Sequence, residues 1–192
     1  MDPNRMALSG EELFSKYLKE KDGKVFEQLV EMYESDLSSF IYGIVQDYHE
    51  TKQLTIEAFA RLAVGGSRFE GRSSIKTYLF TIGKNLALRH VKKHRRDHHI
   101  PLEDVVGVLA SDQEDPMYFM EREENRRMLH KALEGLKDEH RAVLILLYFE
   151  DMSYEEVAKI MSKSVKQVGD LAYRAKAAMK RKLEADGFTY SS

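Results

Sequence analysis

Two capping-box spacings that start only 11 residues apart constrain the fold of this chain more than any other feature: Ser153 with Glu156, and Ser164 with Gln167. In a capping box, two side chains three residues apart satisfy backbone donors at a helix start. Two helix starts this close predict a short helix, a tight turn and a second helix, the geometry of a helix-turn-helix. An ordinary helical hairpin is the alternative. The preceding segment favours the helix-turn-helix, because its very apolar AVLILLYF suits the central support of a trihelical unit.

The second helix of this pair has an apolar and a polar face. Val165, Val168, Leu171 and Ala172 are predicted to pack inward. The outer face is predicted to expose Lys166, Gln167, Asp170, Tyr173, Arg174 and Lys176. In a helix-turn-helix this helix enters the major groove, where its side chains reach base edges and phosphates. The pattern therefore predicts a duplex DNA-binding surface.

The rest of the chain also follows helical periodicity, and no segment alternates as a strand does. A first helix starts near Ser9, where Glu12 completes another capping-box spacing. The other predicted helices are Val25–Val45, Thr51–Ala63, Ile75–Lys93, Met117–Leu136, Asp138–Phe149, Ser153–Met161 and Ser164–Glu184. We predict an all-α fold of two small helical domains, residues 1–97 and 118–192, joined by an acidic linker over residues 98–117.

A basic band lies between two acidic blocks. Residues 67–99 hold 9 basic and 2 acidic side chains, against 7 and 12 in residues 1–66 and 5 and 11 in residues 100–139. The band includes FEGRSSIKTYLFTIGKNLALRHVKKHRR, Phe69 to Arg96, in which Ser73 or Ser74 can cap a helix that turns sharply basic. Phosphate is the expected counter-charge. Phe69 and Tyr78 offer stacking surfaces, and Ser73, Ser74 and Asn85 offer hydrogen bonds, to an unstacked base.

Several functional classes are excluded or disfavoured. The chain has no cysteine, which removes disulfides, thiolate metal sites and cysteine nucleophiles. No nucleophile motif or phosphate-binding loop is present, so we expect no catalytic residue and no enzyme. His90, His94 and His98 share one helical face, but basic neighbours favour a polar helix end, and we expect neither a metal nor a cofactor. Without an apolar run long enough for a bilayer, we expect a cytoplasmic protein with no membrane insertion.

Two long stretches together resemble the extracytoplasmic-function subfamily of bacterial sigma factors, which carry the second and fourth conserved sigma regions. The first stretch holds FEQLVEMYESDLSSFIY, then LTIEAFARL, then FEGRSSIKTYLFTIGKNLALRHVKK. The second is YFEDMSYEEVAKIMSKSVKQVGDLAYRAKAAMKRKL. The resemblance implies a dissociable, non-catalytic subunit that binds core RNA polymerase and gives it promoter specificity. Promoter DNA is then the second partner, and an anti-sigma factor is a further partner that the resemblance leaves open.

The resemblance also assigns roles to residues. The helix around Leu54 to Leu62 would dock on the polymerase clamp, through Gln53, Leu54, Ile56, Glu57, Phe59 and Arg61. The segment from Ser164 to Lys176 would enter the major groove of the minus-thirty-five element. The loop and helix of the basic band would capture the melted minus-ten strand, through Arg68, Phe69, Arg72, Ser73, Ser74, Lys76, Tyr78, Lys84, Asn85, Arg89, Lys92 and Lys93.

Some positions depart from the family pattern. Gln53 and Ile56 stand where an acid and a glutamine are usual, and Gly169 and Leu171 where a lysine and an arginine are often found. Fewer cations on the second helix predict weaker phosphate anchoring. Two other classes stay open: a helix-turn-helix regulator that binds DNA without polymerase, and a small metal-binding or protein-binding helical module.

Overall fold

The computed structural model describes residues 8–66, 69–97, 133 and 135–185. In this part of the chain the secondary structure consists of seven α-helices with no strand, which confirms the predicted all-α class. None of these helices is long and apolar enough to cross a membrane. The linker predicted over residues 98–117, and nearly all of the helix predicted over Met117–Leu136, lie outside the described residues.

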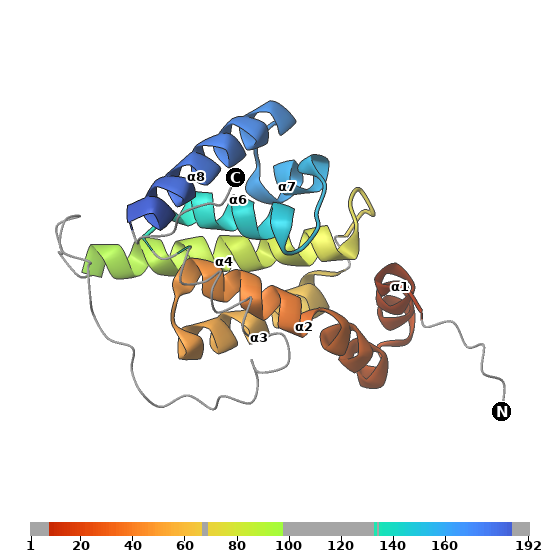
Figure 1. Cartoon of the computed structure of the whole chain (residues 1–192). Helices are drawn as coiled ribbons and strands as arrows, with labels where there is room; N and C mark the ends of the chain where they lie inside the picture. Colours follow the sequence, from red (N-terminus) through yellow and green to blue (C-terminus); the bar gives the residue numbers. More distant parts are fainter. Residues whose placement is uncertain (1–7, 67–68, 98–132, 134, 186–192) are drawn as a thin grey trace, which may run out of the picture.

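The helices form two groups. An N-terminal unit contains α1 (Gly10–Glu20), α2 (Gly23–Val45), α3 (Tyr48–Gly65) and α4 (Ile75–Asp97). A C-terminal unit contains α6 (Asp138–Tyr148), α7 (Tyr154–Met161) and α8 (Val165–Ala185). Figure 1 shows α4 running through the middle of the molecule, with α2 and α3 on one side and α6 and α7 on the other. The two units are therefore in direct contact, and α4 lies at their junction.

Helix starts follow from local capping chemistry. Ser9 and Glu12 form the predicted capping box at α1. The Asp22 side chain caps α2 by accepting from the Lys24 N–H at 2.9 Å. Helix α3 begins earlier than the predicted Thr51, because Asp47 Oδ1 accepts from the Glu50 N–H at 2.8 Å and starts the helix at Tyr48. Acceptors of this kind satisfy orphan backbone donors, which explains why the starts lie where these residues occur.

The core of the N-terminal unit is centred on the α2–α4 crossing. The Phe40 and Phe80 rings stack with centroids 5.3 Å apart, and both side chains are fully buried. At Gly83 an added Cβ would lie 2.8 Å from Leu37 Cδ1, so glycine is required for the backbone of α4 to approach α2 this closely. This contact fixes α4 as a rigid rod on which the polar residues of the basic band are displayed.

Candidate nucleic-acid and polymerase interfaces

Helices α7 and α8 form the predicted helix-turn-helix. Ser162 adopts the left-handed conformation at φ 55°, and the Lys163 N–H donates to the Ala158 carbonyl at 3.0 Å, which closes α7. Ser164 and Gln167 then cap each other reciprocally, at 2.8 and 3.2 Å. The Ser153–Glu156 box at the start of α7 is also formed. Both capping boxes are therefore confirmed, and they fix the residues at which α7 and α8 begin.

Apolar packing orients α8. Its inward side chains Val168, Leu171 and Ala172 are buried, whereas Val165, which we predicted to pack, is 44% exposed. Val165 is the first residue of α8. Leu171 is only 4% exposed, so it contributes to packing rather than to the outer face.

The outer face of α8 is open to solvent. The residues predicted to contact duplex DNA are all exposed: Ser164, Lys166, Gln167, Asp170, Tyr173, Arg174 and Lys176. Tyr173 is 77% exposed. The Lys176 ammonium lies 4.6 Å from the Tyr148 ring centroid, and its hydrogen bond with that tyrosine raises the lysine pKa. Lys176 therefore stays charged and is held over α6.

The loop before α4 is supported from inside the N-terminal unit. The Phe69 ring packs edge-on against Phe14, with ring centroids 5.7 Å apart, and lies tilted by 52° against Tyr78, with centroids 5.2 Å apart. Both Phe69 and Tyr78 are half-buried. Ser74 caps α4, since its Oγ accepts from the Thr77 N–H at 3.1 Å, as predicted for Ser73 or Ser74. Each ring of the Phe69–Tyr78 pair is therefore already in contact with another ring.

The predicted strand-capture residues fall into distinct groups in the structure. Five are exposed: Arg72, Asn85, Arg89, Lys92 and Lys93. Four are half-buried at the loop and the start of α4: Phe69, Ser73, Ser74 and Tyr78. Lys76 is half-buried and Lys84 is only 5% exposed, because both contact the C-terminal unit. Arg68 lies outside the described residues.

Contacts between the two units use several polar groups. The Lys84 ammonium donates to the Ile160 carbonyl at 2.7 Å, and burial lowers the pKa of this lysine. Lys76 pairs with Glu150 at 3.1 Å. Arg141 of α6 donates to the Ile44 carbonyl of α2 at 3.0 Å. Part of the predicted DNA surface is therefore covered by the protein itself.

Helix α1 contributes a residue to this site that the sequence did not reveal. Glu11 Oε1 accepts from the Ile75 N–H, the first residue of α4, at 3.0 Å. A carboxylate at a helix N-terminus satisfies an orphan donor and interacts favourably with the helix dipole. The two residues are 64 positions apart, so no local spacing could have identified the contact.

We expect Glu11→Ala to lower the free energy of unfolding by about 1 kcal/mol, because the start of α4 loses a capping acceptor. Glu11→Gln should retain most of the stability, since its amide oxygen can still accept. Urea unfolding of both variants measures the difference. Glu20→Ala, at an exposed carboxylate on the same helix, is the matched control and should change stability by less than about 0.5 kcal/mol. Equal loss in the Ala and Gln variants would contradict the capping role.

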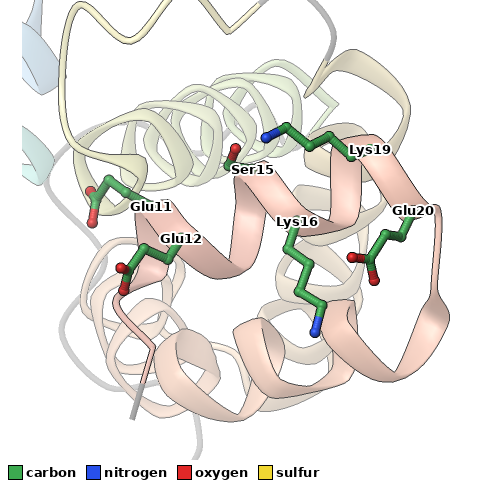
Figure 2. Close-up of a pocket in the computed structure, with 6 residues that line it drawn as sticks. All are labelled: Glu11, Glu12, Ser15, Lys16, Lys19 and Glu20. Carbon is green, nitrogen blue, oxygen red and sulfur yellow. The ribbon is translucent and has the colours of Figure 1, made fainter. Parts of the chain in front are cut away.

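A surface hollow of about 390 Å³ runs along α1. Figure 2 shows its lining side chains: Glu11, Glu12, Ser15, Lys16, Lys19 and Glu20. All six come from a single helix, and their charges nearly balance. Because the lining residues bring no converging group from a second element, the hollow is not a candidate binding site.

Helix α3 presents the predicted polymerase-facing residues in two ways. Leu54 and Phe59 are 8% and 5% exposed and pack inward, with the Phe59 ring against Phe26. A solvent-facing stripe remains, in which Glu57 is half-buried and the other members are exposed: Gln53, Ile56, Ala60, Arg61 and Val64. Ile56 is 61% exposed and Val64 86%, and Glu57 pairs with Arg61 at 2.6 Å. Val64 was missed because we predicted the helix to end at Ala63.

The histidines of α4 form a stacked pair. The His90 and His94 rings lie 4.1 Å apart, and His90 Nδ1 lies 3.3 Å from Glu50 Oε2. Burial and the neighbouring His94 lower the pKa of His90. In the described residues no group of three or more His, Asp or Glu is placed to hold a metal ion. His98 and His99 lie outside those residues.

Two family descriptions match successive parts of the chain. Residues 29–97 match "Sigma-70 region 2" and residues 126–179 match "Sigma-70, region 4". The first match ends with α4, and the second includes α6, α7 and most of α8. The two families therefore correspond to the two helical units.

The chain is also similar to known proteins over most of its length. RNA polymerase sigma-H factor of Pseudomonas aeruginosa is 30% identical over 170 residues, covering 85% of this chain and 88% of the relative. RNA polymerase sigma factor YlaC of Bacillus subtilis is 26% identical, with 86% and 95% covered. Among solved structures, the sigma factor RpoE in complex with the anti-sigma factor NepR from Bartonella quintana superposes with a TM-score of 0.64 at 22% identity, covering 85% and 99%.

Proposed function

The chain belongs to the bacterial RNA polymerase sigma factors, in the extracytoplasmic-function subfamily, and on this basis we propose which surfaces carry out its function. It binds core RNA polymerase and directs promoter-specific initiation of transcription. We propose that residues 1–97 form the unit for polymerase binding and minus-ten recognition, that residues 118–192 form the unit for minus-thirty-five recognition, and that residues 98–117 link them.

The capped helix-turn-helix carries the proposal for the C-terminal unit. Its second helix is fixed by reciprocal caps and by buried Val168 and Leu171, while its outer face is open. We assign the major-groove contacts to this face, from Ser164 to Lys176. Lys166, Arg174 and Lys176 supply positive charge for phosphates, and Gln167 has an amide that can read a base edge.

For the N-terminal unit we assign strand capture to the loop and one edge of α4. Arg89, Lys92 and Lys93 are exposed along the basic end of the helix and would hold the backbone. Phe69 and Tyr78 would stack with a displaced base after local rearrangement, since each already contacts another ring. Lys76 and Lys84 would join them only once the C-terminal unit has moved away.

The exposed stripe on α3 is the proposed contact with the polymerase clamp. It combines two open apolar side chains, Ile56 and Val64, with the Glu57–Arg61 ion pair. An apolar centre with a polar rim is typical of protein–protein interfaces. We propose this stripe in place of the full predicted set, because Leu54 and Phe59 support the helix from within.

The remaining assignments follow from the family. As a sigma factor the chain is an initiation subunit, and we infer that it catalyses no reaction. We also infer that it acts in the cytoplasm, where core polymerase and promoter DNA are found. An anti-sigma factor is a proposed further partner, because the structurally similar RpoE was solved in complex with one.

The decisive experiment is transcription in vitro with core polymerase on genomic DNA fragments, followed by mapping of start sites. We expect initiation at a defined set of promoters only when the chain is present. Footprinting of the isolated chain distinguishes the alternative, since a regulator that acts without polymerase would protect a specific site alone. Absence of promoter-dependent initiation together with such a footprint would overturn the assignment.

A further inference from the structure

Two buried cationic side chains connect the units, and each unit supplies one of them. Lys84 of α4 is 5% exposed and donates to the carbonyl of Ile160, in the last turn of α7. Arg141 of α6 is 6% exposed and donates to the carbonyl of Ile44, in the last turn of α2. Each unit thus supplies a positive charge to the C-terminal end of a helix in the other unit.

Helix C-termini suit this exchange, because their last carbonyls lack intrahelical partners and the helix dipole is negative there. The Arg141 guanidinium is oriented within its own unit, because it also donates to the Leu136 carbonyl at 2.7 Å and to Asp138 Oδ1 at 2.8 Å. Lys84 plays the same part for the N-terminal unit. Its ammonium contacts the last turn of α7, next to the turn of the helix-turn-helix. The two contacts therefore fix the C-terminal unit at two separate points.

Further polar contacts surround this pair. Lys76 of α4 pairs at 3.1 Å with Glu150, whose side chain is 2% exposed. The Lys159 ammonium of α7 donates at 3.0 Å to the carbonyl of Arg72 in the loop before α4. The lysines engaged on α4 are two of the cations assigned to promoter-strand capture.

We propose that Lys84 and Arg141 form a reciprocal latch that holds the free chain closed, and that Lys84 exchanges the Ile160 carbonyl for a promoter phosphate when the chain opens. The second half of this proposal rests on the proposed function. The first half is a property of the free chain and needs neither polymerase nor DNA.

The latch is suited to a reversible switch. Removing a charged group from water carries a large free-energy penalty, which offsets most of the gain from its new hydrogen bonds. Buried cations therefore fix the relative position of the two units more than they add to the net stability of the closed form. Burial lowers the pKa of Lys84, which is the direction expected when the closed form penalises its charge. On opening, both cations are rehydrated, and the phosphate backbone offers Lys84 a full opposite charge.

Energy transfer within the full chain tests the closed state. The chain has no cysteine, so Gln28→Cys on α2 and Ala177→Cys on α8, both exposed, give two unique dye positions in the separate units. We expect high transfer in the free chain and low transfer after core polymerase is added. Lys84→Glu, which places a carboxylate against a carbonyl, should convert most free molecules to low transfer while helix content measured by circular dichroism is unchanged.

A milder variant connects the latch to polymerase binding without altering the assigned DNA-binding or polymerase-binding residues. Glu150→Gln with Lys159→Ala should raise the open-to-closed ratio about tenfold, because two contacts between the units are weakened or lost. Apparent affinity for core polymerase should improve as the open fraction rises. Glu155→Gln with Lys180→Ala makes the same two changes at exposed positions of the same unit and is the matched control.

The outcomes separate the two proposals. Low transfer in the unmodified free chain, or unchanged transfer in a folded Lys84→Glu variant, would overturn the latch. A different result would count against the proposed function alone. In that result, transfer is high in the unmodified chain and is lost in Lys84→Glu, but the unmodified chain fails to support promoter-dependent transcription. The latch would then still stand.

Discussion

Alanine at both Lys92 and Lys93 is expected to weaken promoter complexes by tenfold or more, and by a similar factor on every promoter. Both side chains are exposed at the basic end of α4 and no described residue pairs with them. Each phosphate contact contributes about 0.9 to the dependence of log affinity on log salt for duplex DNA and about 0.7 for a single strand, so the double variant should lower that slope by roughly 1.4 to 1.8. Promoter binding by the assembled holoenzyme, measured at several salt concentrations, provides both quantities.

The control for this prediction is Lys16→Ala with Lys19→Ala on the exposed face of α1, seen in Figure 2, which removes the same net charge. It should leave promoter affinity and the salt slope nearly unchanged. If the two double variants weaken binding equally, only the overall charge matters and α4 has no specific role. Unfolding in urea should differ little among these proteins, because exposed substitutions usually change stability by less than about 0.5 kcal/mol.

Local chemistry made much of this fold predictable. The capping boxes at Ser9, Ser153 and Ser164 depend on side chains three residues apart, and all three are formed. Helical periodicity likewise predicted α2 and α4, because an amphipathic stripe is a property of a single segment. The helix-turn-helix follows from two such local signals in succession, which is why its exposed face could be assigned from sequence.

Contacts between distant segments could not be predicted in this way. Lys84 looked like one more exposed cation in a basic helix, yet it is buried against Ile160, 76 positions away. Phe69 looked like a free stacking surface, yet it packs against Phe14 of α1. Periodicity assigns each residue to a face of its helix but does not say which element covers that face. Here the C-terminal unit covers part of the basic face of α4.

These two results change the role that we propose for the basic band. Its exposed end, with Lys92 and Lys93, is available in the closed chain, and we propose that it makes an early electrostatic contact with DNA. Its inner end, with Lys76 and Lys84, is available only after the units separate. Under the latch proposal, opening would therefore add cations to a surface that already attracts DNA, and the strand-capture site would be complete only in the open form.

Ile56→Asp should reduce affinity for core polymerase by about thirtyfold, which is the effect of losing an interface hot spot of roughly 2 kcal/mol. Ile56 belongs to the exposed stripe on α3 and is 61% exposed, so little of its surface is needed for folding. An aspartate there would have to be desolvated without a partner when the clamp docks. Titration of labelled chain with core polymerase measures the loss, and urea unfolding checks that the fold is retained.

Met32→Asp on α2 is the appropriate control, because Met32 is also an exposed apolar side chain, at 40%, but lies outside the stripe. It should leave polymerase affinity nearly unchanged, whereas Val64→Asp should weaken binding in the same direction as Ile56→Asp. Phe59→Ala is unsuitable for this purpose, since a buried phenylalanine costs about 3–5 kcal/mol of folding free energy when truncated, and lost binding would then reflect a lost fold. Normal polymerase affinity in folded Ile56→Asp would exclude the α3 stripe as the clamp contact.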